Sequence, residues 1–351
     1  MAVDDDDDLP PLSRRENKRQ RSVRPEAQDV LRLARVIWSR APDKARSTQT
    51  EDHDFREHFG CGVLVALSLW GLLLTTASLP DGGTLEQLLW TLLFMKTYAK
   101  QKTLCSLCGG IDPQTFQKWV KLFVDAISSL EPNVVRNNQD RTFACHRIFM
   151  LSLFLLFLLQ IVWENRFKSD VGNDCLMTVD GTDFRIPEHG KVFYSHKFKK
   201  SGLRYEVGLC IATGDIVWLN GPYECGRWPD ISIFRDSLLS HLAPAERIEA
   251  DDHGYFGEHP LHVKCPAGFA NPESTLFMQQ RARNRQETVN KRFKDWGLLK
   301  QVYRHEIAGH GVAFRAIAVI TQLAINGGEA LFECGYQDPP YDNNDDDDND
   351  L

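Results

Sequence analysis

The stretch from residue 175 to residue 186 constrains the fold more than any other part of this sequence. It is a short apolar run, rich in β-favouring side chains, and a carboxylate, Asp180, stands where the run meets Gly181. A carboxylate at the end of a buried strand is costly unless a positive charge meets it. The stretch therefore predicts a buried strand whose acidic end faces something positive.

Two further acidic positions follow along the chain. Asp252, preceded by Asp251, stands 72 residues after Asp180, and Glu287 stands 35 residues after Asp252. Carboxylate oxygens are the ligands that hard octahedral cations such as Mg²⁺ and Mn²⁺ prefer. We expect these carboxylates to converge and to hold divalent metal.

The order of elements after residue 175 predicts how the carboxylates meet. Strand, strand, strand, helix, strand and a later helix is the ribonuclease H-like arrangement, an α/β fold with a mixed sheet and flanking helices. In it, a helix joins an antiparallel three-strand meander to a fourth, parallel strand, so the acidic strand ends are neighbours. The expected strands cover residues 175–186, 204–212, 216–219 and 247–252, and the expected helices cover residues 231–242 and 281–299.

Three carboxylates in this geometry suit chemistry at phosphorus. Two metal ions can activate the attacking oxygen and stabilise the leaving oxygen of an in-line displacement. We therefore expect a DNA phosphodiester as the substrate and two Mg²⁺ or Mn²⁺ ions as the cofactor. The expected catalytic and metal-binding residues are Asp180, Asp252 or Asp251, and Glu287.

Four stretches together resemble the DDE transposases of the PIF/Harbinger group, which are related to bacterial insertion-sequence transposases. The resemblance runs from about residue 85 to residue 336. It implies the same acidic triad, cleavage of DNA at the ends of a mobile element, strand transfer with Mg²⁺, and transposition as the biological role. The stretches are residues 179–183 (VDGTD), 221–230 (GPYECGRWPD), 250–255 (ADDHGY) and 283–294 (RNRQETVNKRFK).

The second acidic position departs from the pattern of that family. The family has Asp-x-Gly-Tyr, whereas this chain has Asp251-Asp252-His253 before Gly254 and Tyr255. Counting back from Gly-Tyr selects Asp252, which also alternates with Ile248 and Ala250 on one strand face. If His253 is an additional residue, Asp251 takes the role instead. Both alternatives stay open.

Basic residues gather in two places near the expected site. One group follows the Asp180 strand, and the other flanks Glu287 on its helix. Such residues can contact DNA phosphates, although a basic loop is often only solvated. The candidate DNA contacts are Lys197, Lys199, Lys200, Arg204, Arg281, Arg283, Arg285, Lys291 and Arg292.

Residues 85–130 have the outline of a helix-turn-helix: a short helix, a turn at Gly109-Gly110, and a second helix. Asp112 and Pro113 are placed as N-cap and first residue of that second helix, and Asp230 similarly caps the helix at residues 231–242. Reading DNA is one interpretation of the unit, and an ordinary helical bundle is the other. The polar face of its second helix carries Gln114, Gln117, Lys118 and Lys121.

Composition divides the rest of the chain. Its 351 residues suffice for one large domain or two smaller ones. The net charge of −7 argues only weakly against nucleic-acid binding, because much of the acid lies in aspartate runs at both ends. We expect a disordered arm at residues 1–50, a helical domain at 51–145, an apolar helix and linker at 146–170, a nuclease domain at 171–336, and a disordered acidic tail at 337–351.

Two apolar runs approach the length of a membrane span. Residues 61–79 contain Gly, Ser and Thr and lack basic flanks, and residues 148–163 form a run of 16 that contains Gln160. Buried helices are the preferred interpretation of both, and we expect no membrane partner. The second run is foreign to the resembling family, and no role for it follows from the sequence.

Cysteine usage and the N-terminus indicate a reducing, intracellular location. The nine cysteines are unevenly spaced, and the pair Cys105 and Cys108 reads as buried thiols rather than a zinc site. Because the first residues are acidic and then basic, we expect no signal peptide. The basic cluster at residues 14–21 can serve as a nuclear import signal, so we expect the nucleus.

The expected partners follow from the resemblance. They are double-stranded DNA, as element ends and as target, a possible separate DNA-binding protein, and further copies of this chain in a homo-oligomer. The alternative function is a catalytically inactive, transposase-derived protein that binds DNA or another protein. A third alternative is a structure-specific nuclease with no part in transposition.

Overall fold

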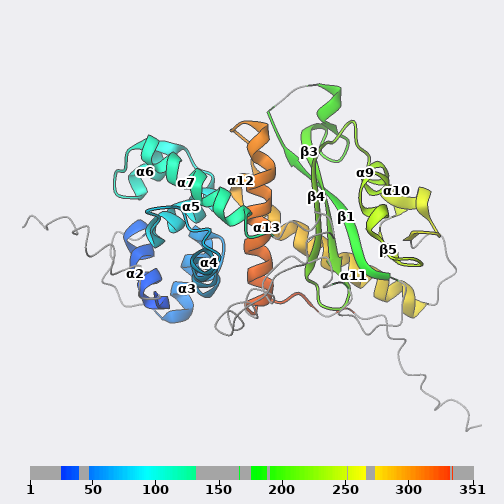
Figure 1. Ribbon diagram of the computed structural model, residues 1–351, viewed down its shortest axis with the longest axis horizontal. Coiled ribbons are helices and arrows are strands. Elements are labelled where there is room, and N and C mark those ends of the chain that lie inside the picture. Colours follow the sequence, from blue (N-terminus) through cyan, green and yellow to red (C-terminus); the bar gives the residue numbers. More distant parts are fainter. Residues whose placement is uncertain are drawn as a thin grey trace, which may run out of the picture.

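The computed structural model describes residues 25–38, 47–131, 166, 175–187, 190–250, 252–265, 273–332 and 334. A helical unit lies on one side, an α/β unit lies on the other, and one long helix, α13, stands between them (Figure 1). Four features discussed above lie outside the described residues. They are the basic cluster at residues 14–21, the apolar run at residues 148–163, Asp251, and the acidic tail at residues 337–351.

Within the described residues, six helices build the helical unit. The expectation of an unfolded arm at residues 1–50 is wrong for α2, because Val30, Leu31, Ala34 and Ile37 recur at helical spacing and are buried. Arg35 Nη2 of α2 also pairs with Glu51 Oε1 of α3 at 2.5 Å. The helices are α2 (Ala27–Trp38), α3 (Thr48–Phe59), α4 (Val63–Thr75), α5 (Leu85–Thr97), α6 (Gln101–Leu107) and α7 (Pro113–Ser128).

The local signals for this unit are confirmed. The Asp112 carboxylate accepts a hydrogen bond from the Thr115 backbone N–H at 2.9 Å, and Pro113 opens α7. The apolar run at residues 61–79 becomes α4, and most of its large side chains are buried. Cys105 and Cys108 are buried free thiols.

The α/β unit is built on a mixed open sheet. Strands β1 (Cys175–Arg185), β3 (Lys200–Cys210) and β4 (Ile216–Glu224) form an antiparallel meander, and β5 (Arg247–Glu249) and β6 (Val263–Lys264) continue beside β1 in parallel. The short β2 (Tyr194–Ser195) pairs with the start of β3. Across the sheet the order is therefore β4-β3-β1-β5-β6.

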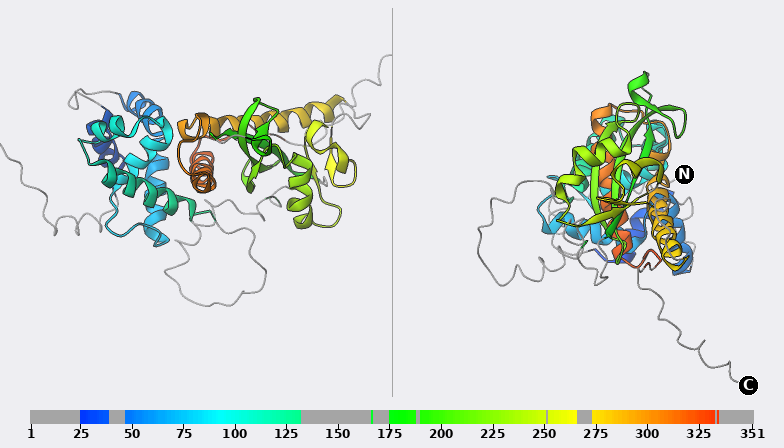
Figure 2. Two further views of the ribbon diagram at one scale, coloured as in Figure 1. Left: turned by 90° about the horizontal axis from the view of Figure 1, so that it is seen from above. Right: turned by 90° about the vertical axis from the view of Figure 1, so that its right-hand side faces the viewer.

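Helices cover both faces of this sheet. The 22-residue α11 (Glu273–Lys294) crosses one face, and α9 (Asp230–Asp236) and α10 (Asp252–Tyr255) lie on the other, as the view from above shows (Figure 2, left). Side chains alternate along β1 accordingly. Met177 and Val179 pack with Phe234 of α9, whereas Thr178 and Asp180 meet α11. Asp180 therefore lies at the interface between the sheet and α11.

Helix α13 (His310–Asn326) ties the two units together. Its apolar side chains belong to a single buried cluster that also includes residues of α4, α7, β3 and α11. Within the described residues, Ile307–Asn326 is long and apolar enough to cross a membrane, as would be α3 and α4 taken as one bent span. Because 72% of the apolar window in Ile307–Asn326 is buried, the helix is accounted for as the core of this protein.

The end of α11 docks closely on the helical unit. A Cβ at Gly60, which has φ of +80°, would lie 2.6 Å from the Trp296 ring. A Cβ at Gly297, the first residue of α12 (Gly297–Lys300), would lie 2.6 Å from the Lys96 carbonyl oxygen at the end of α5. The C-terminal end of α11 is thus fixed by contacts so close that only glycine fits at positions 60 and 297.

Substituting Gly297 tests this docking. Gly297→Ala should lower the free energy of unfolding by about 1–3 kcal/mol, because the new methyl group meets backbone that cannot rotate away. Gly71→Ala is the matched control: Gly71 lies inside α4 with open space at its Cβ position, so alanine should stabilise by about 0.5–1 kcal/mol. Urea unfolding of both variants measures the difference, and equal effects would contradict the close approach.

Candidate active site

The Asp180 carboxylate is held beneath α11. Its Oδ2 accepts a hydrogen bond of 2.7 Å from Asn290 Nδ2. Burial, with smaller contributions from the carboxylates of Asp230 and Glu287, raises the pKa of Asp180 to about 6 against the lowering effect of Lys197. The carboxyl group is thus poised to take up a cation or a proton.

Glu287 reaches the same place from α11. It precedes Asn290 by one helical turn, so the two side chains lie on the same side of the helix. Its side chain is exposed, and its charge contributes to the raised pKa of Asp180. Asp180 and Glu287 are thus close enough for the charge of one to act on the other, and their joint role at a metal site stays a prediction.

The choice between Asp251 and Asp252 stays a prediction. Asp251 lies outside the described residues, and for Asp252 only the backbone, at the start of α10, is described. The loop that carries them does come to the site. Gly254 packs against the Asp230 carboxylate, with its Cβ position 3.3 Å from Asp230 Oδ2.

Asp230 is the site residue that sequence reasoning assigned to a different role. The N-cap of α9 is Pro229 and makes no side-chain cap, and Asp230 is the first helical residue, so the expected cap is wrong. Its carboxylate instead lies against Gly181, where a Cβ would come within 2.0 Å of Oδ1. The glycine directly after Asp180 was the available signal, because it leaves room for this acid.

A buried arginine joins Asp230 to a further acid. Arg204 binds Asp183 through two hydrogen bonds of 2.7 and 3.0 Å, and its Nη1 lies 3.2 Å from Asp230 Oδ1. Ser195 donates a hydrogen bond of 2.6 Å to Asp183 Oδ2. Although burial by itself would raise it, the pKa of Asp183 is lowered by these hydrogen bonds. Asp183 is thereby committed as an ionised structural partner of Arg204.

Two lysines lie among these acids. Lys197 donates to the Gly181 carbonyl oxygen across 3.5 Å, and its charge acts on Asp180 and Asp183. Lys294, two turns after Glu287 on α11, has its pKa lowered by burial and by Lys197. Only Lys197 was among the expected residues. Lys294 repeats the helical spacing of Glu287 and Asn290, and this pattern could have identified it.

The oxygens at this site are of the kind that a hard divalent cation binds. The buried Oδ1 of Asn290 has no hydrogen-bond partner, and Oδ1 of Asp230 has an ion pair but no hydrogen bond. Among the side chains that the structure describes, however, no three His, Cys, Asp or Glu residues are grouped to hold a metal. The residues thus fit a cation in part, and a third carboxylate would have to come from residues 251–252.

Two of the expected DNA contacts, Arg204 and Arg285, have side chains that are bonded inside the protein, which does not favour contact with DNA. Arg204 is 13% exposed and bound to Asp183. Arg285 is 1% exposed, and its Nη2 donates to the carbonyl oxygens of Cys210 and Ile211. Both guanidinium groups satisfy buried acceptors, which leaves neither accessible to a phosphate.

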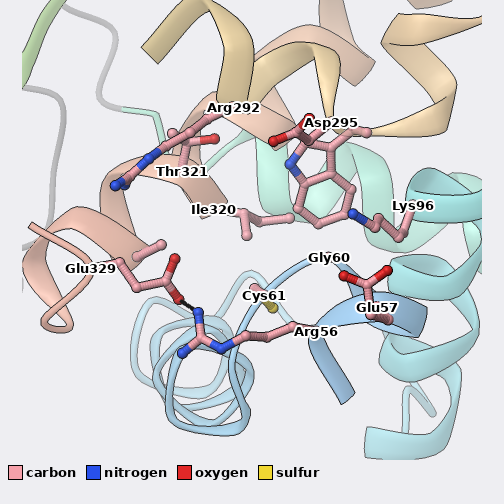
Figure 3. Close-up of a pocket in the computed structure, with 12 residues that line it drawn as sticks. Arg56, Glu57, Gly60, Cys61, Lys96, Arg292, Asp295, Ile320, Thr321 and Glu329 are labelled. Atoms are coloured by element: carbon pink, nitrogen blue, oxygen red, sulfur yellow. Dashed lines mark hydrogen bonds and ion pairs between the residues drawn. The ribbon is translucent and has the colours of Figure 1, made fainter. Parts of the chain in front are cut away.

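Arg292 faces the helical unit rather than the sheet. It lines a cavity of about 230 Å³ where α3, α5, α11 and α13 meet, with Arg56, Lys96 and Glu329 around it (Figure 3). Arg56 is paired with Glu329 in this cavity, and it also forms an ion pair with Asp52, which is not a lining residue. Burial lowers the pKa of Arg292. This direction away from the carboxylates does not favour contact with DNA at the site.

The other basic residues keep their expected role as predictions. Lys197, Lys199, Lys200 and Lys291 are exposed, while Arg281 and Arg283 are partly buried. Arg281 lies 5.2 Å from the centre of the Phe332 ring. Arg283 is close enough to the buried Glu249 to act on its pKa. The exposed lysines are therefore the stronger candidates for contact with phosphate.

Sequence reasoning also missed two buried acids of the sheet. Glu206, with a pKa raised by burial to about 8, accepts hydrogen bonds from Trp218 Nε1 at 2.9 Å and from the Tyr255 hydroxyl at 3.4 Å. Glu249 has its pKa raised by burial to about 8 beside Lys264. Both would be protonated near neutral pH, which allows an acid to occupy an interior position. The alternation of apolar and polar residues along β3 and β5 did not distinguish these buried acids from exposed ones.

Comparisons of this chain with family models, with curated proteins and with solved structures gave no match. The geometry described above is therefore the basis for any functional conclusion.

The raised pKa of Asp180 predicts that removing its charge by substitution increases the free energy of unfolding, and that the increase depends on pH. Because the folded-state pKa exceeds the usual value, the wild-type protein should lose stability as the pH rises through about 6. Asp180→Asn keeps an oxygen that can accept from Asn290 but carries no charge. It should therefore match the wild type at pH 5 and exceed it by about 1–3 kcal/mol at pH 8. Urea unfolding at the two pH values measures the difference in unfolding free energy between the variant and the wild type. The same difference at pH 5 and pH 8 would contradict a raised pKa for Asp180.

Proposed function

We propose that this protein is a metal-dependent DNA endonuclease of the DDE transposase type, which cuts DNA phosphodiester bonds and joins strands. The observation that carries the proposal is the buried Asp180 carboxylate of β1, which is held by Asn290 of α11 and is close enough to the exposed Glu287 of α11 for the charge of Glu287 to act on its pKa. A buried carboxylate whose pKa is raised by burial and by neighbouring acids is a candidate for a functional site.

The sheet supports the proposal at the level of topology. A meander of three antiparallel strands, followed by α9 and then by strands parallel to β1, is compatible with a ribonuclease H-like core. In such a core β1 and β5 are adjacent, so an acid after β5 lies near Asp180. The acids Asp251 and Asp252 directly follow that strand in this chain.

Each residue of the site has a separate proposed role. Asp180, Glu287 and one of Asp251 or Asp252 would hold Mg²⁺ or Mn²⁺, which when bound supplies charge that stabilises the oxygens at phosphorus. Asn290 fixes the orientation of Asp180 through its hydrogen bond. Lys197 and Lys294 bring positive charge to the place where a DNA phosphate would lie.

Binding of DNA is proposed to involve exposed cations and the helical unit. Lys199, Lys200 and Lys291 are exposed around the site, and the polar face of α7 is also exposed. That face is suited to a helix-turn-helix role in the nucleus, with element ends or a separate DNA-binding protein as partner and with further copies of this chain. The residues of that face are Gln114, Gln117, Lys118 and Lys121.

One observation favours the second candidate, an inactive DNA- or protein-binding protein derived from a transposase. The described side chains include no group of three metal-binding residues, and the Lys197 ammonium lies close enough to Asp180 to act on its pKa. A lysine can replace a cation as the partner of a buried carboxylate. In that case the fold and the exposed cations would remain and catalysis would not.

Nicking of supercoiled plasmid DNA in Mg²⁺ or Mn²⁺ tests the proposal. We expect the wild-type protein to nick, and Asp180→Asn and Glu287→Gln each to reduce the rate at least about 100-fold, because each removes a metal ligand. The exposed acid Asp236 of α9 provides the control, since Asp236→Asn should leave the rate unchanged. Comparing Asp251→Asn with Asp252→Asn assigns the third acid.

The outcomes separate the two candidates. Equal rates in wild type, Asp180→Asn and Glu287→Gln would contradict the proposed site. A wild-type protein that binds DNA with strong salt dependence but never nicks would support the inactive binding protein.

A further inference from the structure

The segment that leads into β3 carries exposed lysine and aromatic side chains. It runs from η2 (Lys191–Phe193) through β2 to the first residue of β3, at the top of the α/β unit in Figure 1, and we call it the 191–200 hairpin. Tyr194 is 39% exposed, and His196 is also exposed. The hairpin contains no Asp or Glu, and its lysines are all exposed. They are Lys191, Lys197, Lys199 and Lys200. Positive charge combined with exposed aromatic rings is suited to single-stranded nucleic acid.

The two exposed rings stand on either side of a buried anchor. Ser195 is completely buried, and its hydroxyl donates to Asp183 Oδ2 at 2.6 Å. The rings of Tyr194 and His196 meet edge to face, with centres 5.2 Å apart and planes at 88°. Such a pair covers at most one face of each ring, so a further flat aromatic group can stack on a face that remains. A nucleic-acid base is a group of this kind.

Close contacts with the strands hold the hairpin in place. The Gly226 backbone N–H donates to the Val192 carbonyl oxygen at 2.8 Å. A Cβ at Gly226 would lie 2.0 Å from the Lys191 carbonyl oxygen, so only glycine permits this approach. The Phe198 ring packs over Gly202 of β3, where a Cβ would come within 2.5 Å of it. Rings on a support that is already ordered lose little conformational entropy when a ligand binds.

The hairpin also reaches the carboxylate site. Lys197 directly follows His196, and its ammonium group donates to the Gly181 carbonyl oxygen across 3.5 Å. The charge of Lys197 lowers the pKa of Asp180 against the effect of burial. A nucleotide stacked on the Tyr194 and His196 rings would therefore have its adjoining phosphates within reach of Lys197, beside the buried carboxylate.

We propose that the 191–200 hairpin binds unpaired nucleotides of the DNA substrate. Tyr194 and His196 stack on bases, and the lysines of the hairpin bind the flanking phosphates. This inference rests on the proposed nuclease function and adds the form of the substrate to it: a strand whose bases are unpaired beside the carboxylates. Within a duplex the faces of each base are covered by its neighbours, so stacking on the hairpin requires a strand that is single or locally opened.

Fluorescence anisotropy of the full chain with two labelled strands in EDTA tests the stacking. One strand is an oligothymidylate of about 12 nucleotides, and the other has the same number of phosphates but abasic sugars throughout. The wild-type protein should bind the oligothymidylate about 5- to 100-fold more tightly, because only that strand offers bases to the rings. Tyr194→Ala should weaken oligothymidylate binding about 5-fold or more and leave abasic binding unchanged. Tyr194→Phe keeps the ring and should stay within about twofold of the wild type.

Phe256→Ala is the matched control. Phe256 is 53% exposed and stacks on His259 with ring centres 5.6 Å apart, so it is a second exposed ring beside a histidine, outside the hairpin. Its replacement should leave both affinities unchanged. Replacing Lys199 and Lys200 together by glutamine should instead weaken binding of both strands by the same factor and reduce the salt dependence, because these side chains contact phosphate and not bases.

Equal wild-type affinity for the two strands would overturn the proposal and indicate contact with phosphate alone. A preference for oligothymidylate that Tyr194→Ala leaves intact would overturn it as well, because the bases would then stack elsewhere. Since no metal is present, neither outcome depends on cleavage. A protein that nicks plasmid DNA but does not distinguish the strands would refute only the role of the hairpin, whereas a Tyr194-dependent preference without nicking would refute only the nuclease activity.

Discussion

The burial of the Asp180 carboxylate between the sheet and α11 is the constraint on which this structure depends. A charge in that position must be compensated, and the surrounding elements each contribute: Asn290 from α11, Lys197 from the turn before β3, and Lys294 from the end of α11. The sheet and α11 together hold the Asp180 carboxylate in a buried position where polar and charged side chains surround it.

Asp183 and Asp230 differ from Asp180 in that both form ion pairs with an arginine. Asp183 and Asp230 share the Arg204 guanidinium, which keeps two carboxylates close to Asp180 without leaving their charge unbalanced. Removing one residue of a buried group of ion pairs leaves the charge of its partner buried without compensation, which destabilises the protein. The acidic site is therefore stabilised from the α9 side of the sheet by an arginine, and on its α11 side Asn290 donates a hydrogen bond to Asp180.

Sequence patterns predicted the strands and helices well where their period is set by local burial. The Asp180 strand, the hairpin at residues 213–215, and the Asp112 cap followed from alternation, turn residues and capping chemistry. What the sequence could not supply was the partner of each charge. Arg204 and Arg285 looked like surface cations because local patterning does not show which carbonyl or carboxylate a long side chain will meet. Asp230 looked like a cap for the same reason, and the helix α2 was missed because a charged flank obscured its apolar spacing.

The most direct measurement of the central claim is a calorimetric titration with Mn²⁺. If Asp180 and Glu287 join a third acid at a cation site, the wild-type protein should bind Mn²⁺, and Asp180→Asn and Glu287→Gln should each abolish the binding heat, while Asp236→Asn retains it. Binding should also weaken as the pH falls below about 6, because a proton then competes for Asp180. Identical titrations for the wild type and both site variants would contradict this claim.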